Sequence, residues 1–282
     1  MTQPAGTLFV VATPIGNLDD LTPRARRTLA DADLIAAEDT RHSATLLQHF
    51  GIATRCVALH EHNERDVSAD LVERLRAGTT IALISDAGTP LVSDPGFRLV
   101  RAAREAGIRV SPVPGACAAI AALSAAGLPS DRFVFEGFLP AKGAARRSHL
   151  QALRHETRTL VFYESSHRIV EMLADLLAEF GAVRRGVVAR ELTKVFETVL
   201  DGTLAELAAR VAADANQQRG EFVVLVAGAD DDAAAARLVA GRRAFDLLRK
   251  ELPPGRAARL AAEISGAPRN ALYAAADTDR DA

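Results

Sequence analysis

The chain has 282 residues, enough for two domains with their own cores, and a formal net charge of −2. Its 49% hydrophobic and 25% charged residues are typical of a globular protein and exclude a uniformly basic nucleic-acid binder, although not a local basic surface. No apolar run approaches the roughly 20 residues of a membrane span, and the N-terminus lacks the pattern of a signal peptide. The two cysteines, Cys56 and Cys117, form no metal or redox motif. We therefore expect a cytoplasmic protein without a structural metal.

The first half of the chain repeats one pattern, an apolar run followed by a polar or glycine- and proline-containing turn and then a helical segment. The runs occupy residues 7–12, 34–37, 81–84 and 109–113. Apolar runs of this kind are typical of strands covered on both faces, and their alternation with helices predicts a mainly parallel sheet. The turns would then share one edge of that sheet, where open α/β folds bind ligands.

The turn at residues 85–96, SDAGTPLVSDPG, is the strongest candidate for a ligand-binding loop. Gly88 and Pro90 allow a sharp bend and a close approach of the backbone, and Asp86 and Asp94 add two acids. An ordinary connection between a strand and a helix is the alternative. The segment Pro114-Gly115-Ala116-Cys117-Ala118 follows another strand with small residues, which suit either backbone contact with a ligand or close packing of a helix on the sheet.

Two polar clusters also follow strands. One spans residues 38–42 (EDTRH) and suits either a site or a helix N-terminus where the helix dipole favours acids. The other spans residues 60–65 (HEHNER) and suits either a loop that faces a ligand or a solvated loop; its spacing matches no metal motif. The chain contains neither GxGxxG nor GxxxxGK[ST], so a dinucleotide-binding fold of that type and a P-loop NTPase are disfavoured.

The second half predicts a more mixed sheet after a linker at residues 127–130. Strands are expected at residues 133–138, 159–163, 187–189, 195–200 and 221–227, with a helix over 169–180 and a turn at Asp201-Gly202. Residues 141–147 (AKGAARR) indicate a mobile basic loop. Such a loop would place RNA through its phosphates, or would simply be solvated.

The tail from Asp230 is expected to be helical, with helices at 245–250, 257–264 and 269–276 around a turn at 265–268. This arrangement is similar to a helix-turn-helix. Basic residues concentrate here, namely Arg242, Arg243, Arg249, Lys250, Arg256, Arg259 and Arg269. We expect a small RNA-docking domain; an appendage that supports packing or dimerisation is the alternative.

Eight motifs in order carry a resemblance to a known family. They are TPIGN (13–17), AEDTR (37–41), SDAGTPLVSDPG (85–96), PGACA (114–118), GFLP (137–140), YESSHR (163–168), RELTK (190–194) and GEFVVLV (220–226). The set resembles the tetrapyrrole methylase superfamily and, within it, the ribosomal RNA small-subunit methyltransferase I branch. Ser166 departs from the proline usual in that branch, and Cys117 from a common serine.

The resemblance implies two α/β domains with S-adenosylmethionine in the cleft between them, without a GxGxG loop. With the linker at residues 127–130 and the change in the sequence from Asp230, the expected domains are residues 1–127 and 130–229, followed by a small helical domain at 237–282. The resemblance also implies a homodimer that acts on the 16S rRNA of the small ribosomal subunit, with no membrane association. The cofactor would be bound by Ile15, Asp86, Gly88, Thr89, Pro90, Val92, Cys117, Ala118, Tyr163 and Val223.

The reaction implied by the resemblance is methylation of the ribose 2′-hydroxyl of a cytidine in the decoding region. Such a transfer needs aligned reactants and benefits from a base. The expected catalytic residues are Glu38, Asp39 and Arg41, facing Arg190, Glu191 and Lys194 across the cleft. Each of these residues would equally serve in a structural ion pair. His62 and Glu64 are further candidate bases, Arg168 is a candidate phosphate ligand, and Asp86 and Asp94 are expected to shape their loop or contact the cofactor.

Two other functions fit the same sequence. A small-molecule methylase that acts on corrin or porphyrin precursors would share the fold but would not need the basic tail. A noncatalytic ribosome-associated RNA-binding protein would not need small residues at three strand ends that face a ligand.

Overall fold

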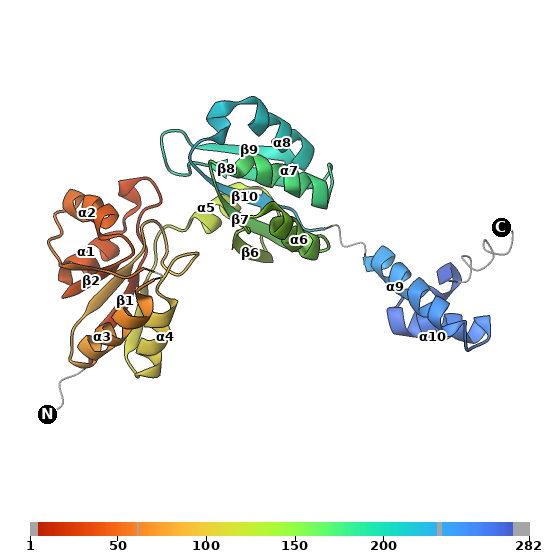
Figure 1. Ribbon diagram of the computed structural model, residues 1–282, viewed down its shortest axis with the longest axis horizontal. Coiled ribbons are helices and arrows are strands. Elements are labelled where there is room, and N and C mark those ends of the chain that lie inside the picture. Colours follow the sequence, from red (N-terminus) through yellow and green to blue (C-terminus); the bar gives the residue numbers. More distant parts are fainter. Residues whose placement is uncertain (1–4, 61, 230–232, 273–282) are drawn as a thin grey trace. The chain divides into compact units, whose positions relative to one another are not determined.

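The computed structural model describes residues 5–60, 62–229 and 233–272. The chain divides into two compact units, Met1–Ala227 and Gly228–Ala282. The larger unit contains two five-stranded sheets with helices packed on them, which confirms the predicted α/β class (Figure 1). Within the described part of the chain, no helix is long and apolar enough to cross a membrane.

The first sheet is entirely parallel, as the sequence predicts, with strand order β3-β2-β4-β1-β5. Its strands are β1 (Thr7–Val11), β2 (Leu34–Ala37), β3 (Cys56–Ala58), β4 (Ile81–Ile84) and β5 (Arg109–Val113). The accompanying helices are α1 (Pro23–Asp31), α2 (Thr40–His49), α3 (Glu64–Arg76) and α4 (Phe97–Glu105), with a short 3-10 helix η1 (Leu18–Asp20). Strands β2 and β4 are buried along their whole length because hydrophobic clusters cover both faces of the sheet.

The second sheet is mixed, again as predicted, with strand order β6-β7-β10-β8-β9 and a parallel pairing of β6 with β7. Its strands are β6 (Phe133–Phe138), β7 (Thr159–Ser165), β8 (Arg185–Arg190), β9 (Thr198–Thr203) and β10 (Glu221–Val226). The expected turn at Asp201-Gly202 is wrong, because both residues pair with β8 inside β9. The chain turns earlier, through residues 191–197.

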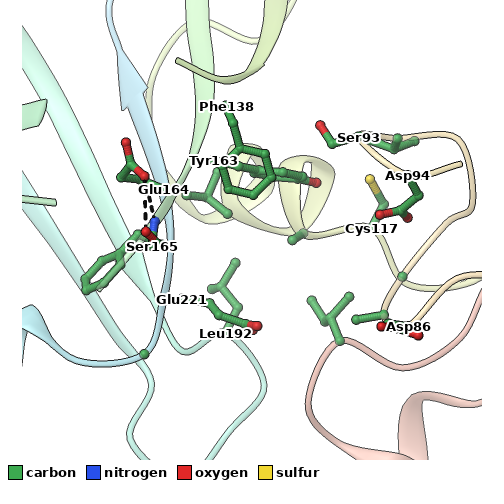
Figure 2. Close-up of a pocket in the computed structure, with 18 of the residues that line it drawn as sticks. Asp86, Ser93, Asp94, Cys117, Phe138, Tyr163, Glu164, Ser165, Leu192 and Glu221 are labelled. Atoms are coloured by element: carbon green, nitrogen blue, oxygen red, sulfur yellow. Dashed lines mark hydrogen bonds between the residues drawn. The ribbon is translucent and has the colours of Figure 1, made fainter. Parts of the chain in front are cut away.

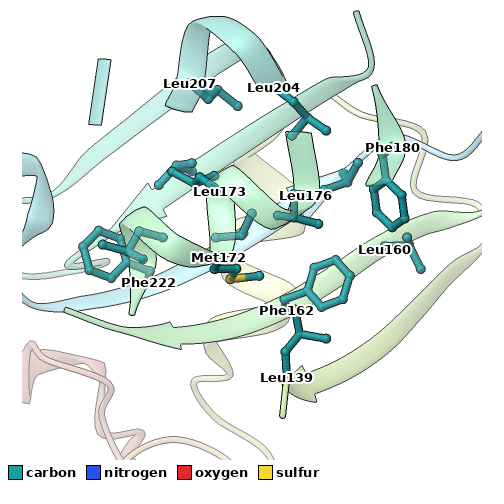
Figure 3. Close-up of a cluster of buried hydrophobic side chains, with 14 of the residues drawn as sticks. Leu139, Leu160, Phe162, Met172, Leu173, Leu176, Phe180, Leu204, Leu207 and Phe222 are labelled. Atoms are coloured by element: carbon teal, nitrogen blue, oxygen red, sulfur yellow. The ribbon is translucent and has the colours of Figure 1, made fainter. Parts of the chain in front are cut away.

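One face of the second sheet is covered by α6 (Gly143–Leu153), α7 (Ile169–Phe180) and α8 (Leu204–Ala213). Figure 3 shows the core on this side, where Phe162 of β7 lies near Met172 of α7. A second 3-10 helix, η2 (Ala215–Gln218), precedes β10. This packing fixes the strand ends that face the first sheet.

Helix α5 (Ala118–Ala125) packs on the opposite face of the second sheet, although it follows the last strand of the first (Figure 1). Its small residues Ala119 and Ala122 are buried with Val161, Val187 and Val223 of that sheet. The packing therefore groups α5 with the second sheet, and we propose that the chain passes from one lobe to the other at residues 114–117. The boundary after residue 127 stays a prediction.

Local signals explain where several helices begin and end. Helix α1 has Pro23 at its first position, and the Thr22 hydroxyl accepts a hydrogen bond from Ala25 N at 3.1 Å. Helix α7 ends at Gly181, whose φ of +90° suits glycine. The end of α7 confirms the helix predicted over residues 169–180.

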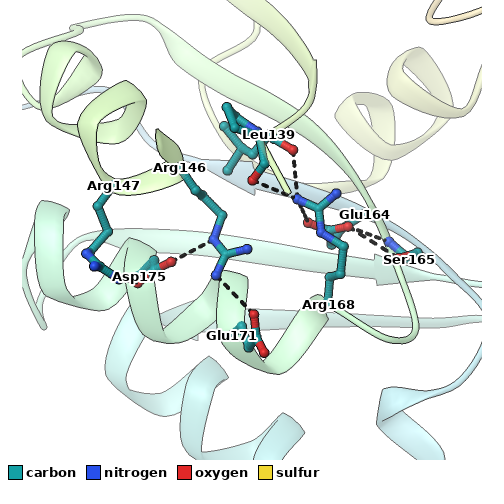
Figure 4. Close-up of polar contacts among 9 residues, drawn as sticks. Leu139, Arg146, Arg147, Glu164, Ser165, Arg168, Glu171 and Asp175 are labelled. Atoms are coloured by element: carbon teal, nitrogen blue, oxygen red, sulfur yellow. Dashed lines mark hydrogen bonds and ion pairs between the residues drawn. The ribbon is translucent and has the colours of Figure 1, made fainter. Parts of the chain in front are cut away.

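The predicted basic loop at residues 141–147 is wrong, because the chain is helical from Gly143 onwards as α6 (Figure 4). Arg146 is only 3% exposed. Its Nε donates to Asp175 Oδ2 at 2.6 Å and its Nη2 to Glu171 Oε2 at 3.2 Å, which ties α6 to α7. Arg147 also reaches Asp175, at 3.4 Å. Arg146 is therefore a structural cation rather than an RNA ligand.

We expect Arg146→Ala to lower the free energy of unfolding by about 3–5 kcal/mol, because it leaves the mostly buried Asp175 carboxylate without its main partner. The matched control is Arg147→Ala, which removes a half-exposed side chain and should cost less than about 1 kcal/mol. Urea denaturation of both variants checks this, and equal losses would contradict the structural role of Arg146.

The smaller unit contains α9 (Ala233–Leu248) and α10 (Pro254–Ser265), so the helix expected at 245–250 begins well before it. Its core comprises Phe245, Ala257, Ala258, Ala261, Ala267 and Leu272. Gly241 lies where α9 meets the turn after α10, and a Cβ there would come within 2.7 Å of Ser265 Oγ. Residues 269–272 are helical, while the rest of the helix expected at 269–276 lies outside the described residues.

Candidate functional site

A cavity of about 450 Å³ lies between the strand ends of the two sheets, inside the larger unit (Figure 2). Its first wall comes from the loops after β1, β2 and β4 and from the start of α5. Its second wall comes from the ends of β6 and β7, the loop after β8 and the start of β10. The first wall is the edge of the parallel sheet at which the sequence predicts a ligand.

The loops after β1 and β4 are joined through their backbones. Thr13 N donates to Gly88 O at 2.8 Å, and Gly88 N donates to Thr13 O at 3.1 Å. The Thr89 hydroxyl donates to Ala116 O at 2.9 Å and so connects the loop after β5 to the same group. Gly88 has a φ of +83°, and a Cβ there would lie 3.1 Å from Ile15 Cγ2, so glycine suits both the backbone and the space.

The far end of the 85–96 loop is held by Glu64, at the start of α3. Its Oε1 accepts hydrogen bonds from Gly96 N at 3.0 Å and Arg98 N at 2.7 Å, at the first turn of α4. A carboxylate at this position also complements the helix dipole. Neither Glu64 nor His62 lines the cavity, so neither is placed to act as the general base.

Three carboxylates gather on the first wall, namely those of Glu38, Asp86 and Asp94. Asp86 N lies 3.5 Å from Glu38 Oε2, and Asp86 Oδ1 accepts from Asp39 N at 3.0 Å. Burial, with the neighbouring Asp86 charge, raises the pKa of Glu38. Burial and the charges of Glu38 and Asp86 raise the pKa of Asp94 to about 6, against the opposing hydrogen bond from Ser85. The wall therefore favours a cationic ligand and contains a group that titrates near neutral pH.

The second wall contains a cation between two acids. Lys194 Nζ lies 2.8 Å from Glu191 Oε1 and 2.8 Å from Glu221 Oε2. Burial lowers the pKa of Lys194, but the two hydrogen bonds outweigh it and raise the pKa above its ordinary value. The aliphatic part of the Lys194 side chain packs against Gly16, where a Cβ would collide with Lys194 Cγ. Lys194 therefore stays protonated and is not a base.

Backbone strain concentrates in the loops on both sides of the cavity. Among the described residues, the non-glycine residues with positive φ are Leu91 and Ser93 in the first wall's loop, and Glu191 and Thr193 in the loop after β8. Left-handed conformations at such residues cost about 1–3 kcal/mol each and cluster at functional sites. This pattern independently points to the same cavity.

The structure brings together every residue that the sequence assigns to the cofactor except one. Ile15, Asp86, Gly88, Thr89, Val92, Cys117, Ala118, Tyr163 and Val223 line the cavity. Pro90 is buried within the loop and does not line the cavity. The Tyr163 hydroxyl accepts from Ala119 N at 3.1 Å, so it joins β7 to the start of α5, and burial raises its pKa well above the ordinary value.

The expected catalytic residues are only partly brought together. Glu38 and Lys194 line the cavity, whereas Glu191 lies behind Lys194. Asp39 begins α2 by accepting from Arg41 N at 2.8 Å, and its carboxylate pairs with the exposed Arg41 guanidinium at 2.9 Å. These hydrogen bonds hold the pKa of Asp39 near 2. Asp39 and Arg41 therefore form a local pair outside the cavity.

Two further arginines have structural partners instead of facing the cavity. Arg190 is 7% exposed, and it donates to Arg219 O at 2.7 Å and Phe196 O at 2.8 Å, which stabilises the loop after β8. Arg168 donates to Leu139 O at 2.7 Å and pairs with Glu164 at 3.3 Å (Figure 4). Phe138, Leu192 and Glu221 also line the cavity, although the sequence assigns them neither to the cofactor nor to catalysis. The GFLP motif was the signal available for Phe138.

Comparison with known proteins identifies the family. The family model of Tetrapyrrole (Corrin/Porphyrin) Methylases matches residues 7–208, and the model of the RsmI C-terminal HTH domain matches residues 229–278. The chain is 63% identical over 268 residues to the "Ribosomal RNA small subunit methyltransferase I" of Xylella fastidiosa (strain Temecula1), covering 95% of this chain and 98% of that one. The chain belongs to the ribosomal RNA small subunit methyltransferase I family of tetrapyrrole methylases. Members from Pseudomonas aeruginosa (62% identical, covering 95% of this chain and 96% of that one) and Escherichia coli O157:H7 (55%, covering 95% and 93%) carry the same name.

Solved structures share the tetrapyrrole methylase fold with the chain. The uroporphyrin-III-C-methyltransferase from Thermus thermophilus has a TM-score of 0.56 at 23% identity and covers 79% of this chain and 94% of that one. The methyltransferase CobJ has a TM-score of 0.59 at 22% identity and covers 80% and 95%. At this identity the likeness shows the fold, which confirms the predicted methylase architecture. Within the described residues, no group of three His, Cys, Asp or Glu is placed to hold a metal ion.

Proposed function

We propose that the chain transfers a methyl group from S-adenosylmethionine to the ribose 2′-hydroxyl of a cytidine in the decoding region of 16S rRNA. The observation that carries the proposal is the acid-walled cavity on which nearly all the predicted cofactor residues converge. The names of the relatives support a substrate in the small-subunit ribosomal RNA. A related solved structure, the Thermus thermophilus uroporphyrin methylase "complexed with S-adenyl homocysteine", supports the cofactor class.

The residues present fit S-adenosylmethionine, which would supply a methyl group on a positively charged sulfur. Ile15, Val92 and Val223 provide apolar contact area, and the approach of the backbone at Gly88 leaves room beside them. Glu38 and Asp86 offset positive charge in a site that is partly closed from water. The cavity thus combines apolar surface with negative charge, as this cation requires.

We assign Asp94 as the general base that accepts the proton of the 2′-hydroxyl. It lines the cavity, accepts a hydrogen bond from Ser85 and has a pKa of about 6, so it is ionised and basic at neutral pH. Asp94 would accept the proton that the 2′-hydroxyl loses as its oxygen takes the methyl group, which S-adenosylmethionine would supply with its sulfur as the leaving group. Positioning of the acceptor oxygen in line with that bond accounts for much of the acceleration.

Ligand-induced stabilisation and methyl transfer test the proposal together. S-adenosylmethionine at 100 times its Kd should stabilise the protein by about 2.7 kcal/mol, and small ribosomal subunits lacking the modification should accept a methyl group. A noncatalytic RNA-binding protein would show no stabilisation. A corrin or porphyrin methylase would modify free porphyrinoids and leave the ribosomal subunit unmodified, and either result would overturn the proposal.

The small C-terminal unit is the part that we assign to RNA docking. Residues 237–272 contain eight basic and three acidic side chains. All eight basic residues are exposed, namely Arg237, Arg242, Arg243, Arg249, Lys250, Arg256, Arg259 and Arg269. Over the whole unit, residues 228–282, nine basic and nine acidic residues balance, so the basic excess belongs to its helical part. Since neutralised phosphates release counterions, the exposed basic side chains of this part contribute affinity that weakens with salt. The homodimer implied by the resemblance and the cytoplasmic location expected from the cysteines stay predictions.

Deleting residues 228–282 should raise the KM for ribosomal subunits by tenfold or more and flatten its dependence on salt, because phosphate contacts are lost. S-adenosylmethionine affinity should stay within twofold, since the cavity lies within residues 1–227. Charge reversal at Arg249 and Lys250 in the full chain provides a variant without truncation. An unchanged KM, or a change in oligomeric state without a change in the salt dependence, would favour the packing appendage.

A further inference from the structure

Phe138 is an apolar side chain held open to solvent at the cavity. It is 55% exposed, yet it lines the cavity and lies beside Tyr163, with the ring centroids 5.7 Å apart (Figure 2). Burial of a phenylalanine ring is ordinarily favourable by a few kcal/mol, so an exposed ring in a concave site suits contact with a ligand. The residues assigned to the cofactor and the proton leave this ring without a role.

A β-bulge in β6 places Phe138 on this face. Phe135 pairs with Val161, but Gly137 pairs with Phe162, so Glu136 is the extra residue of the bulge. Side chains three positions apart in a regular strand point to opposite faces, whereas the bulge puts both Phe135 and Phe138 on the side of Tyr163. Gly137 has a φ of +62°, which permits the bulge without strain.

The same glycine lets the first wall approach Phe138. A Cβ at Gly137 would come within 2.9 Å of Ser93 Oγ, so a side chain there would push the 85–96 loop away. Ser93 precedes Asp94, and Gly137 precedes Phe138. Phe138 and Asp94 therefore both line the cavity, Phe138 from the second wall and Asp94 from the first, as Figure 2 shows.

We propose that Phe138 stacks on the base of the acceptor nucleotide, which leaves the helix stack so that its ribose reaches Asp94. An enzyme that acts on one nucleotide within folded RNA must draw it out, and aromatic side chains hold such unstacked bases through their faces. This inference rests on the proposed function. The base edge is not read by Phe138, so the ring provides position and affinity rather than the choice of cytidine.

The test compares Phe138→Ala, Phe138→Leu and Phe138→Trp with Phe196→Ala. Phe196 is 70% exposed and does not line the cavity, so it is the matched control for loss of an exposed ring. Phe138→Ala and Phe138→Leu should lose tenfold or more in kcat/KM for small ribosomal subunits. Phe138→Trp should stay within threefold because its ring can still stack. S-adenosylhomocysteine affinity should stay within twofold for all four variants.

Combining Phe138→Ala with a substrate that lacks the acceptor base separates stacking from a structural role of the ring. Subunits are reconstituted with 16S rRNA whose acceptor nucleotide keeps the ribose but lacks the base. On this substrate Phe138→Ala should cost less than twofold, because the partner of the ring is gone. An undiminished loss would overturn the inference, as would parallel loss of S-adenosylhomocysteine binding, which would assign the ring to the cofactor. If the wild-type protein does not methylate ordinary subunits, the proposed function fails and this inference fails with it.

Discussion

Replacing Gly88 by alanine should weaken S-adenosylmethionine binding by tenfold or more. The new Cβ would lie 3.1 Å from Ile15 Cγ2 and would press on the paired loops that form the first wall. The φ of +83° adds a backbone cost of about 1–2 kcal/mol. Calorimetric titration of the purified variant measures the effect, and an unchanged Kd would mean that the Gly88 loop does not hold the cofactor.

Gly107→Ala is the matched control for backbone strain. Gly107 has a φ of +72° at the end of α4, and a Cβ there would have no atom within 4 Å. Both variants should therefore carry the same backbone cost, about 1–2 kcal/mol, to which Gly88→Ala adds the close contact with Ile15, while only Gly88→Ala loses cofactor affinity. Equal losses of affinity would show that general destabilisation, rather than the wall of the cavity, is being measured.

Asp94→Asn should reduce methyl transfer by about 100-fold to 10,000-fold while S-adenosylmethionine affinity changes by less than fivefold. The amide keeps the size of the side chain but cannot accept the proton. In the wild-type protein, kcat should rise with pH through about 6, where Asp94 ionises, and then level off. A variant that keeps its turnover, or one with the same rising pH profile, would remove Asp94 from the proton transfer.

The same substitution should make the protein more stable at neutral pH. The pKa of Asp94 is raised from 3.8 to about 6, so between these values the folded protein keeps a proton that the unfolded chain releases. Stability therefore falls as pH rises through that window, and Asp94→Asn removes this loss above pH 6. We expect a gain of about 1 kcal/mol, because the carboxylate is partly exposed and solvent screens its interactions. Thermal unfolding at pH 5 and pH 8 should show the gain at pH 8.

The first sheet could be predicted from local patterns because its central strands β1, β2 and β4 are nearly continuous apolar runs. Residues 81–84 form β4 and are fully buried, and the turn after them lies on the ligand-binding edge that a parallel sheet requires. Most of the cofactor wall follows directly, because glycine and other small residues at these strand ends let the backbone come close to a ligand. The motif order supplied the family, which the composition alone would not have given.

The wrong predictions concern charged residues, because a charged side chain in a polar stretch can either face a ligand or form a buried structural contact. Arg146 occurs in a polar, glycine-containing stretch, yet a carboxylate on α7, distant in sequence, pairs with it and buries it. Arg190 likewise meets backbone carbonyls that only the folded loop presents. The place of Phe138 depends on a bulge, which the strand pattern of β6 does not reveal. The roles of Arg146, Arg190 and Phe138 therefore depend on residues distant in sequence and on strand register, which local patterns do not show.

The most direct test of the account is the identity of the methylated atom. Small ribosomal subunits lacking the modification are incubated with the protein and S-adenosylmethionine, and the 16S rRNA is digested to nucleosides for mass spectrometry. We expect one methyl group per subunit, carried on the ribose of a cytidine in the decoding region, and none with Asp94→Asn. A methyl group on the base, or transfer at the wild-type rate by Asp94→Asn, would contradict it.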